Sequence, residues 1–379
     1  MNHLNYLLLS SFLIIIVSII FGTNLKHDIY TFIQAISRMK TSHDDYKIFP
    51  YIIMKGNPNL KNIKRELIKY DKEKYNFNKK FYAETLMILK DDKIIVEEYY
   101  NNNKYNSKFN LFSAVKTLIS LTIGILQDRK LLNINDKVSK YLDWSPFINI
   151  TTIKNVLEMS SGYGDPLLNW YIDMAYDYFG YNLTDRCKNY RINKNIIPGT
   201  YYRYSNLNTQ ILYEIISKIT KKPGYKFIQD NIYFNIIKTD NKWSTDRVYN
   251  VKSFCCLFLN TEDFLRLGKL ILDKGKANGK QIISEKYIND MFIPNTNLID
   301  SEIPTDHNYF YGLQSWTLTV DNIKVNYLHG LQGQLTLIFN QFNLVVTMFA
   351  SDLKSGGRPY NEPMQINIIR EIIKMLNLK

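Results

Sequence analysis

Cysteine is scarce in this chain of 379 residues, and its scarcity excludes several classes of protein. Cys187, Cys255 and Cys256 show neither the spacing of a metal site nor the even number of a disulfide framework. We interpret the adjacent pair as two small hydrophobic residues without chemistry of their own, and we expect no metal ion or other cofactor. A hydrophobic fraction of 45% and a charged fraction of 22% exclude a wholly disordered or collagen-like chain.

Arginine is also scarce, with 10 residues against 38 lysines, although the net charge is +13. Surfaces that bind nucleic acid typically gather Arg-rich patches and aromatic residues on one folded face. Here more than half of the excess charge lies in residues 26–80, which contain 13 Lys or Arg and 6 Asp or Glu. This distribution favours a solvated, membrane-proximal lead, and we expect no nucleic-acid partner.

One long apolar run, residues 7–22, lies near the N-terminus. Its length falls between a signal-peptide core and a full membrane span of about 20 residues. Because Phe21 stands where signal cleavage needs a small residue, we predict an uncleaved signal anchor or transmembrane segment within residues 1–25. The basic residues of positions 26–40 favour a cytoplasmic C-terminal domain, but long domains often cross regardless of such a bias. We expect a single-pass membrane protein whose large domain lies outside the cytoplasm, with the orientation left open.

The remaining pattern predicts an α+β domain over residues 81–379. Strands are predicted over residues 83–89, 94–100, 310–319, 323–328, 334–339 and 344–350. Helices are predicted over residues 114–126, 153–159, 206–219, 261–272 and 364–376. Strands at both ends with helices between them predict one antiparallel sheet and a mostly helical insertion within residues 125–300. We expect the helix after Ser113 to cover one face of the sheet and the C-terminal helix to cover the other. Residues 26–80 are expected to contain at most one short helix.

Ser113 and Lys116 stand at the start of the predicted helix over 114–126. Their spacing places both side chains on one face of a helix, one turn apart. A partly desolvated lysine can lose its proton and then take the proton of the serine. Two other Ser-x-x-Lys pairs, Ser37–Lys40 and Ser351–Lys354, lie in the basic lead and at a strand end, where such chemistry is less expected. A plain helix cap remains the alternative interpretation of Ser113.

Two further segments have residues suited to catalysis or substrate binding. Tyr204 and Asn206 follow a Pro-Gly-Thr turn and precede a helix, and a phenol beside a lysine can relay a proton. His329 and Gly330 lie between two strand patterns, where glycine would let a substrate backbone approach the strand edge. Tyr-x-Asn recurs elsewhere in this Tyr- and Asn-rich chain, and a hairpin turn explains the glycine equally well.

In their order along the chain, these motifs resemble the serine β-lactamase and penicillin-recognising hydrolase superfamily. Ser-x-x-Lys is followed about 90 residues later by Tyr-Ser-Asn, and about 125 residues beyond that by a Gly-x-x-Gly-Gln strand. Similar family segments match residues 157–162, 261–268 and 278–284. The resemblance covers residues 81–379 and is closest to the esterase and 6-aminohexanoate-dimer hydrolase branch. It implies a β-lactamase/transpeptidase-like fold, with an antiparallel sheet flanked by helices and a mostly helical subdomain.

The resemblance also implies roles for individual residues. In that family the residue matching Ser113 is the acylated nucleophile, the one matching Lys116 is its general base, and the one matching Tyr204 is the proton relay. The backbone N–H groups at Ser113 and Leu331 would form the oxyanion hole. The remaining members of the implied substrate and oxyanion site are Asn206, His329 and Gly330.

One departure from the family pattern concerns the substrate. The third motif of the family usually begins with Lys or His, whereas the aligned triplet here begins with Leu328, unless a shift of one residue lets His329 supply the basic group. The resemblance therefore implies a serine hydrolase that cleaves a small-molecule amide or ester through an acyl-enzyme. The alternative is a catalytically silent relative that binds peptides or cell-wall fragments.

Overall fold

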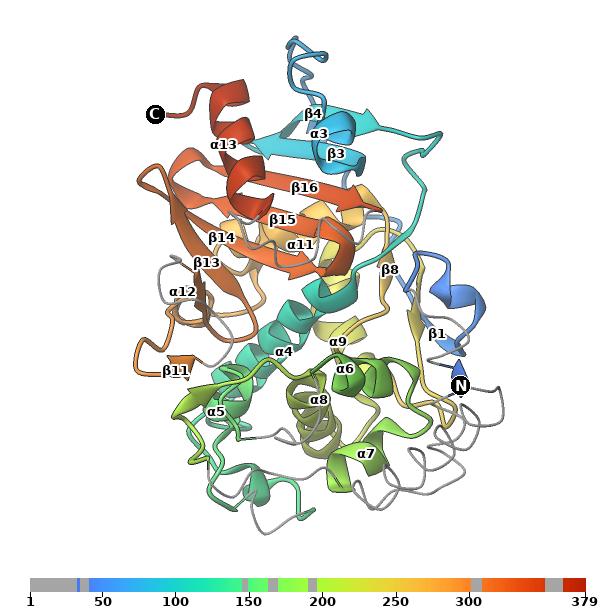
Figure 1. Ribbon diagram of the computed structural model, residues 1–379, viewed down its shortest axis with the longest axis vertical. Coiled ribbons are helices and arrows are strands. Elements are labelled where there is room, and N and C mark those ends of the chain that lie inside the picture. Colours follow the sequence, from blue (N-terminus) through green and yellow to red (C-terminus); the bar gives the residue numbers. More distant parts are fainter. Residues whose placement is uncertain are drawn as a thin grey trace, which may run out of the picture.

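The centre of the computed structural model is an eight-stranded sheet (Figure 1). The structure describes residues 33–34, 41–144, 149–162, 170–189, 196–300, 309–351 and 364–379. In order across the sheet, the strands are β12 (Tyr309–Tyr311), β13 (Trp316–Val320), β14 (Ile323–Gly330), β15 (Gln334–Phe339), β16 (Leu344–Ala350), β3 (Ala83–Lys90), β4 (Lys93–Tyr99) and β2 (Lys64–Arg65). All neighbours pair antiparallel except β2 and β4. The pairing of β16 with β3 joins the two ends of the chain, which confirms the predicted sheet.

Helices cover both faces of this sheet (Figure 1). Helix α11 (Thr261–Leu272) packs on β3, β15 and β16, while α13 (Met364–Leu376) and α3 (Phe77–Phe81) share a hydrophobic core with the other face. The prediction that the helix after Ser113 covers a face is therefore wrong. That helix, α4 (Lys116–Asp128), is buried along almost its whole length and packs against α8 and α12, so it runs from the sheet into the helical part. An apolar helix without a polar face needs neighbours on all sides, which a sheet alone does not provide.

The helical part contains a second large core. Besides α4, its helices are α5 (Ile153–Leu157), α6 (Trp170–Phe179), α7 (Leu183–Asn189), α8 (Asn206–Thr220), α9 (Gly224–Ile228), α10 (Phe234–Ile236) and α12 (Glu285–Asp290). Short helical turns of other types are η1 (Asp45–Lys47), η2 (Phe112–Val115), η3 (Val138–Lys140), η5 (Gln229–Tyr233), η6 (Leu331–Gly333) and η7 (Asn340–Phe342). The small paired strands are β1 (Tyr51–Met54) with β7 (Asn241–Ser244), β5 (Phe109–Asn110) with β8 (Phe258–Leu259), β6 (Tyr201–Tyr202) with β11 (Ile299–Asp300), and β9 (Lys276–Ala277) with β10 (Lys280–Gln281).

The predicted strand over 310–319 is in fact two strands, β12 and β13. The chain turns between them at Gly312, whose backbone lies so close to a neighbouring segment that an added Cβ would be 2.2 Å from the carbonyl oxygen of Met291. The turn consists of Gly-Leu-Gln-Ser at residues 312–315, and a glycine within a predicted strand marks a possible break of this kind.

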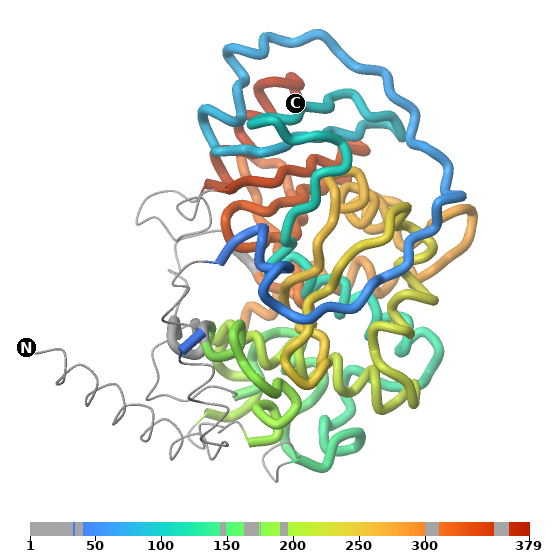
Figure 2. The backbone as a smooth tube through the Cα atoms, turned by 90° about the vertical axis from the view of Figure 1, so that its right-hand side faces the viewer, coloured from blue at the N-terminus to red at the C-terminus, as the bar shows by residue number. Residues whose placement is uncertain are grey.

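The N-terminal part of the chain is only partly described. The predicted signal anchor over 1–25 lies outside the described residues, and no helix within the described part is long and apolar enough to cross a membrane. Within residues 41–80 the structure shows η1, β1 and β2 in addition to the short helix α3. Figure 2 shows this segment, in blue, running along one side of the molecule up to the sheet.

Candidate active site

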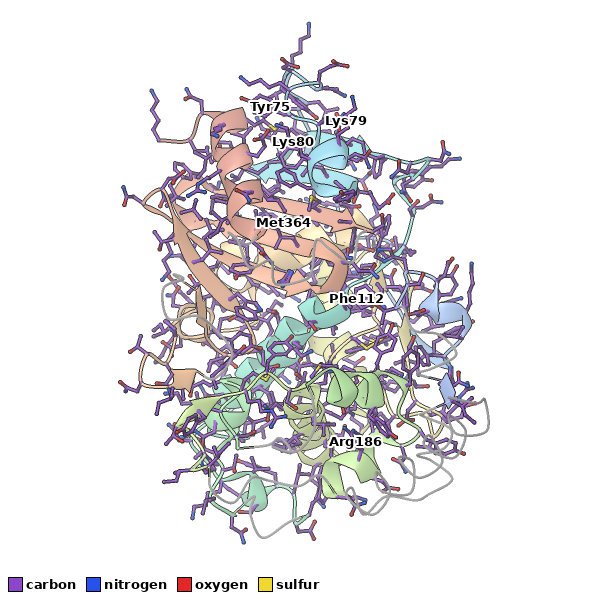
Figure 3. All side chains as sticks on the ribbon, viewed as in Figure 1. Tyr75, Lys79, Lys80, Phe112, Arg186 and Met364 are labelled. Atoms are coloured by element: carbon purple, nitrogen blue, oxygen red, sulfur yellow. A yellow bond between two sulfur atoms is a disulfide. The ribbon has the colours of Figure 1, made fainter. Side chains whose placement is uncertain are left out.

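Ser113 and Lys116 lie at the junction of the sheet and the helical part, where Figure 3 labels the neighbouring Phe112. Ser113 belongs to the tight turn η2, and Lys116 is the first residue of α4. The Lys116 side chain is almost fully buried, and its ammonium donates to three uncharged oxygens. These are Ser113 Oγ at 3.1 Å, Asn206 Oδ1 at 2.8 Å and the Phe254 carbonyl at 3.1 Å. The predicted serine–lysine pair is therefore in hydrogen-bond contact.

Burial lowers the pKa of Lys116 to about 7, and the negative charge of Asp177 opposes this shift only in part. Among the described residues no carboxylate forms a salt bridge with Lys116, so its positive charge is poorly compensated. A buried ammonium held only by neutral oxygens releases its proton far more readily than one in water. Near neutral pH the neutral amine is therefore available to accept the proton of the Ser113 hydroxyl.

Tyr204 lies directly beside this pair. Its ring centroid is 5.0 Å from Lys116 Nζ, and its side chain makes a hydrogen bond with that of Ser113. Burial raises the pKa of the Tyr204 phenol, so the hydroxyl stays protonated over the physiological range. The ring also stacks on Trp316 of β13 at a centroid distance of 6.2 Å, which fixes its orientation from the sheet side. The phenol is thus placed where it could pass a proton to a group leaving from Ser113.

Asn206 joins the site as the first residue of α8. Its amide oxygen accepts from Lys116, and its amide nitrogen lies 3.1 Å from the sulfur of Met174 on α6. This second contact orients the amide so that its oxygen, not its NH₂ group, faces the lysine.

The end of β14 lies against the turn that carries Ser113. A Cβ added to Gly330 would be 2.1 Å from the carbonyl oxygen of Leu111, so only glycine allows this approach. Leu331 follows and packs against the hydrophobic cluster that contains Phe112. The backbone after β14 and the backbone at Ser113 are therefore neighbours, as an oxyanion hole built from their N–H groups requires.

His329 points to the other side of the sheet. Its Nε2 is 3.0 Å from the amide nitrogen of Gln365 on α13, and burial lowers its pKa to about 4. Leu328 is fully buried in the core that includes α4. Neither residue therefore supplies a positive charge to the Ser113 site at neutral pH, and the structure brings His329 to α13 instead.

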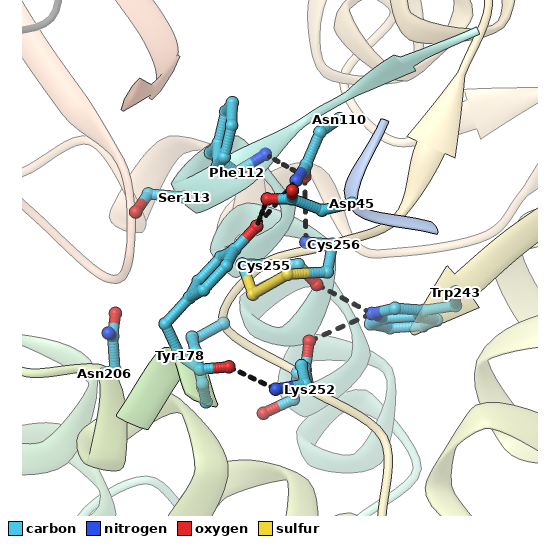
Figure 4. Close-up of a disulfide and its surroundings, with 12 residues drawn as sticks. Asp45, Asn110, Phe112, Ser113, Tyr178, Asn206, Trp243, Lys252, Cys255 and Cys256 are labelled. Atoms are coloured by element: carbon cyan, nitrogen blue, oxygen red, sulfur yellow. Dashed lines mark hydrogen bonds between the residues drawn. A yellow bond between two sulfur atoms is a disulfide. The ribbon is translucent and has the colours of Figure 1, made fainter. Parts of the chain in front are cut away.

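A polar network behind Ser113 was not predicted (Figure 4). The side-chain oxygen of Asn110 accepts from the backbone N–H of Phe112 at 2.9 Å and of Cys256 at 3.1 Å. Its amide nitrogen donates to the hydroxyl of Tyr178 at 3.3 Å, and that hydroxyl donates to Asp45. Phe112 has φ = 45°, a conformation rare for a residue with a side chain, and the Asn110 bond holds it there. No sequence signal marks Asn110, because two of its partners, Tyr178 and Cys256, lie far away along the chain.

The interpretation of Cys255 and Cys256 as residues without chemistry is wrong. The structure joins them in a disulfide between adjacent residues, whereas Cys187 is free and buried in α7 (Figure 4). Adjacent cysteines can pair only if the backbone between them adopts an uncommon conformation, and Cys256 has φ = 67°. Spacing alone does not reveal such a conformation.

A separate hollow of about 630 Å³ lies elsewhere, lined among others by His43, Glu84 and Lys108. Its lining includes none of Ser113, Lys116 and Tyr204, so it is distinct from the candidate site. Within the described ranges no cluster of His, Cys, Asp or Glu could hold a metal ion.

Comparisons with known proteins agree with this fold. Residues 79–236 match the family model named Beta-lactamase. The chain is 28% identical over 133 residues to penicillin-binding protein 4* of Bacillus subtilis (strain 168), covering 34% of this chain but only 29% of that protein. The chain thus matches less than a third of the length of this curated relative.

Two solved structures show how much of the fold is shared. A protein assigned as a 6-aminohexanoate-dimer hydrolase from Bacillus anthracis has a TM-score of 0.75 at 18% identity, covering 89% of this chain and 93% of its own. A protein assigned as a β-lactamase from Bacteroides dorei DSM 17855 has a TM-score of 0.65 at 18% identity, covering 82% of this chain and 100% of its own.

The architecture is thus the β-lactamase/transpeptidase-like α+β fold, as predicted. The family-model match over residues 79–236, the curated relative and the shared fold support the serine β-lactamase-like superfamily and a hydrolase of that kind.

Proposed function

We propose that this protein cleaves an amide or ester bond through an acyl-enzyme on Ser113. Lys116 acts as the general base and Tyr204 as the proton relay. The observation that supports this most directly is the buried Lys116 ammonium, which contacts Ser113 and has only uncharged oxygens as its hydrogen-bond partners.

The proposed reaction begins when the neutral amine of Lys116 takes the proton of Ser113. Ser113 Oγ then attacks the substrate carbonyl carbon, and the carbonyl oxygen becomes an oxyanion that the N–H groups of Ser113 and Leu331 stabilise. Tyr204 donates its proton to the leaving nitrogen or oxygen and is reprotonated from Lys116. Water, activated by the same groups, then attacks the acyl carbon and releases Ser113.

We propose neutral esters and neutral amides as the substrate class. Leu328 is buried, and His329 faces α13 with a low pKa, so neither offers a charge for a substrate carboxylate. The structural neighbour from B. anthracis is assigned as a 6-aminohexanoate-dimer hydrolase, and this name supports an amide as the bond that is cleaved. We further propose that residues 1–25 anchor the enzyme in a membrane, with the hydrolase outside the cytoplasm. This orientation can be tested by adding protease to intact cells, since only a domain outside the cytoplasm should then be digested.

The experiment that tests the function is covalent labelling. The full chain is incubated with a fluorescent fluorophosphonate and, separately, with a fluorescent penicillin, and the labelled peptide is identified by mass spectrometry. We expect an adduct on Ser113 that Ser113→Ala abolishes. Ser351→Ala is the matched control, because Ser351 begins the other Ser-x-x-Lys pair of the main domain, and this variant should label normally. Folded protein that forms no adduct with either probe would favour the silent binding protein instead.

A further inference from the structure

We infer that the Cys255–Cys256 disulfide is a positioning device for the general base. It holds the short segment 254–256 in the conformation in which the Phe254 carbonyl meets Lys116. The inference rests on the proposed function, because it assigns the disulfide a task in the reaction of Ser113.

The disulfide is linked to Lys116 through the neighbouring residue Phe254. Phe254 directly precedes Cys255, and its carbonyl oxygen accepts one of the three hydrogen bonds of the Lys116 ammonium at 3.1 Å. The Phe254 ring also lies 5.6 Å from the same nitrogen. Only one peptide unit therefore separates the disulfide ring from a direct contact of the base.

The disulfide is also linked, through Asn110, to the turn that carries Ser113. The N–H of Cys256 donates to Asn110 Oδ1 at 3.1 Å, and the same oxygen holds the N–H of Phe112, the residue before Ser113. One residue further on, the Leu257 carbonyl accepts from the N–H of Leu111 at 2.9 Å. The disulfide segment is thus linked to Lys116 through Phe254 and to the turn that carries Ser113 through Asn110, and Figure 4 shows the second of these links.

The disulfide segment is also anchored from behind. Trp243, which is fully buried, donates its indole N–H to the carbonyls of Cys255 at 2.9 Å and Lys252 at 3.0 Å. Both cysteines are buried, so the sulfur atoms contribute no surface contact of their own. What the covalent bond adds to these hydrogen bonds is restriction of the backbone at 255–256, because the ring that it closes contains the peptide bond between the two residues.

Reduction would remove this restriction of the backbone without changing the chemical identity of Ser113, Lys116 or Tyr204. An added dithiol such as dithiothreitol supplies two electrons and two protons, the Sγ–Sγ bond breaks to give two thiols, and the reagent becomes a cyclic disulfide. The Phe254 carbonyl is then free to leave Lys116 and water can take its place. A misplacement of about 1 Å at a reacting group can cost about a hundredfold in rate.

The test compares oxidised and reduced full-length protein in detergent. Thiol alkylation after denaturation without reductant should modify Cys187 alone. After native treatment with dithiothreitol we expect acylation of Ser113 at pH 7 to fall at least about tenfold, and to return on reoxidation. Cys255→Ser combined with Cys256→Ser should show the low rate and no response to reductant. Cys187→Ala is the matched control and should respond to reductant as the unmodified protein does.

A second readout follows Lys116 itself and does not need an active enzyme. The ¹³Cε signal of Lys116 in protein labelled with ¹³C-lysine, identified by its loss in Lys116→Met, should titrate near pH 7 when oxidised and at higher pH when reduced, since water then reaches the amine. Alkylation of all three cysteines without reductant, or an unchanged Lys116 titration on reduction, overturns the inference. If Ser113 forms no adduct but the titration still shifts, the proposed function fails, and only the placement of the Lys116 side chain by the disulfide stands.

Discussion

The ammonium of Lys116 and the side-chain oxygen of Asn206 are joined by a hydrogen bond of 2.8 Å, and Asn206 is the uncharged relative of aspartate. A neutral acceptor orients the lysine without stabilising its charge strongly. A carboxylate at the same place would favour the protonated lysine and raise its pKa by about 1–3 units.

Replacing Asn206 with aspartate therefore tests whether Lys116 must lose its proton. We expect Asn206→Asp to depress Ser113 acylation at pH 7 at least about tenfold and to recover much of it toward pH 9, as the raised pKa is passed. Asn206→Ala, which removes the contact without adding charge, should lower the rate without this alkaline shift. Acylation rates measured from pH 5 to 10 separate the two patterns, and parallel profiles would contradict the assigned role of Lys116.

The pH dependence of the unmodified protein follows from the same pKa. Acylation requires neutral Lys116, so its rate should rise with pH through about 7 and then level off. The pKa of Tyr204 is raised, which keeps the relay protonated across this range. His329 has a pKa near 4 and lies on the α13 side, so His329→Gln should leave the midpoint of the profile where it is.

Substitution of Lys116 distinguishes a catalytic base from a structural lysine. Arginine keeps the positive charge but cannot lose it at working pH, so Lys116→Arg should abolish acylation as completely as Lys116→Ala. A structural lysine would be largely rescued by arginine. Retention of most of the acylation rate in Lys116→Arg would rule out the serine–lysine mechanism.

Stability should respond to Lys116 in a pH-dependent way. The folded-state pKa is below the value of the unfolded chain, so the unfolded state binds more protons between about pH 7 and 10.5. The buried charge therefore destabilises the fold fully below pH 7, and this penalty fades as pH rises toward 10.5. At each pH, the free energy of unfolding of Lys116→Ala is compared with that of the parent protein. This difference should be about 3 kcal/mol more favourable to the variant at pH 5.5 than at pH 9. Denaturant melts at the two pH values measure this, and the cavity left by alanine cancels in the difference.

Most of the fold could be predicted because its signals are local. Alternating or continuous apolar residues indicate strands such as β15 and β16, and a long apolar run with helical spacing indicates α4. The spacing of Ser113 and Lys116 is likewise local, since one helical turn sets it. Tyr204 is different: its contact with Ser113 spans 91 positions of the sequence, and only the order of motifs shared with a known family suggested it.

The support of the site could not be predicted for the opposite reason. Asn110 bonds to Tyr178 and Cys256 across separations of 68 and 146 residues, and neither pairing leaves a pattern in composition or periodicity. The covering of the sheet by α11 in place of α4 was also decided by packing. Gly268 lets α11 approach closely, since an added Cβ would be 2.4 Å from Thr336 Cγ2, and a single glycine in a helix gives little indication of this.

Gly330 offers a test of the contact between β14 and the Ser113 turn. Its missing side chain lets the strand reach the Leu111 carbonyl, and a Cβ there must displace one of the two backbones. We expect Gly330→Ala to cost about 1–3 kcal/mol of stability and to lower acylation by more than tenfold at saturating probe. Gly279→Asn is the control, because nothing lies within 4 Å of an added Cβ there and asparagine tolerates its positive φ. If Gly330→Ala kept its activity, the close contact of β14 with the Ser113 turn would not be needed for the oxyanion hole.

The charge of the substrate should matter little for binding at the Ser113 site. Without a basic residue at 328, a substrate carboxylate lacks a charge-assisted hydrogen bond of about 1.5–3 kcal/mol, which is at least tenfold in binding. We therefore expect no preference for a carboxylate, so that a neutral p-nitrophenyl ester should be hydrolysed with a kcat/KM at least equal to that of the matched ester carrying a carboxylate on its acyl part. Leu328 is too deeply buried to be replaced by lysine without loss of the fold, so the comparison varies the substrate and not the protein. Both esters should be measured at low and at high salt. Salt screens the effect of distant surface charges on the carboxylate ester, but it hardly affects a direct contact between the carboxylate and a residue of the site. A difference in kcat/KM that persists at high salt is therefore due to the site itself. Faster turnover of the carboxylate ester, or rapid hydrolysis of penicillin beside slow hydrolysis of the neutral ester, would mean that another cation of the chain binds the substrate carboxylate.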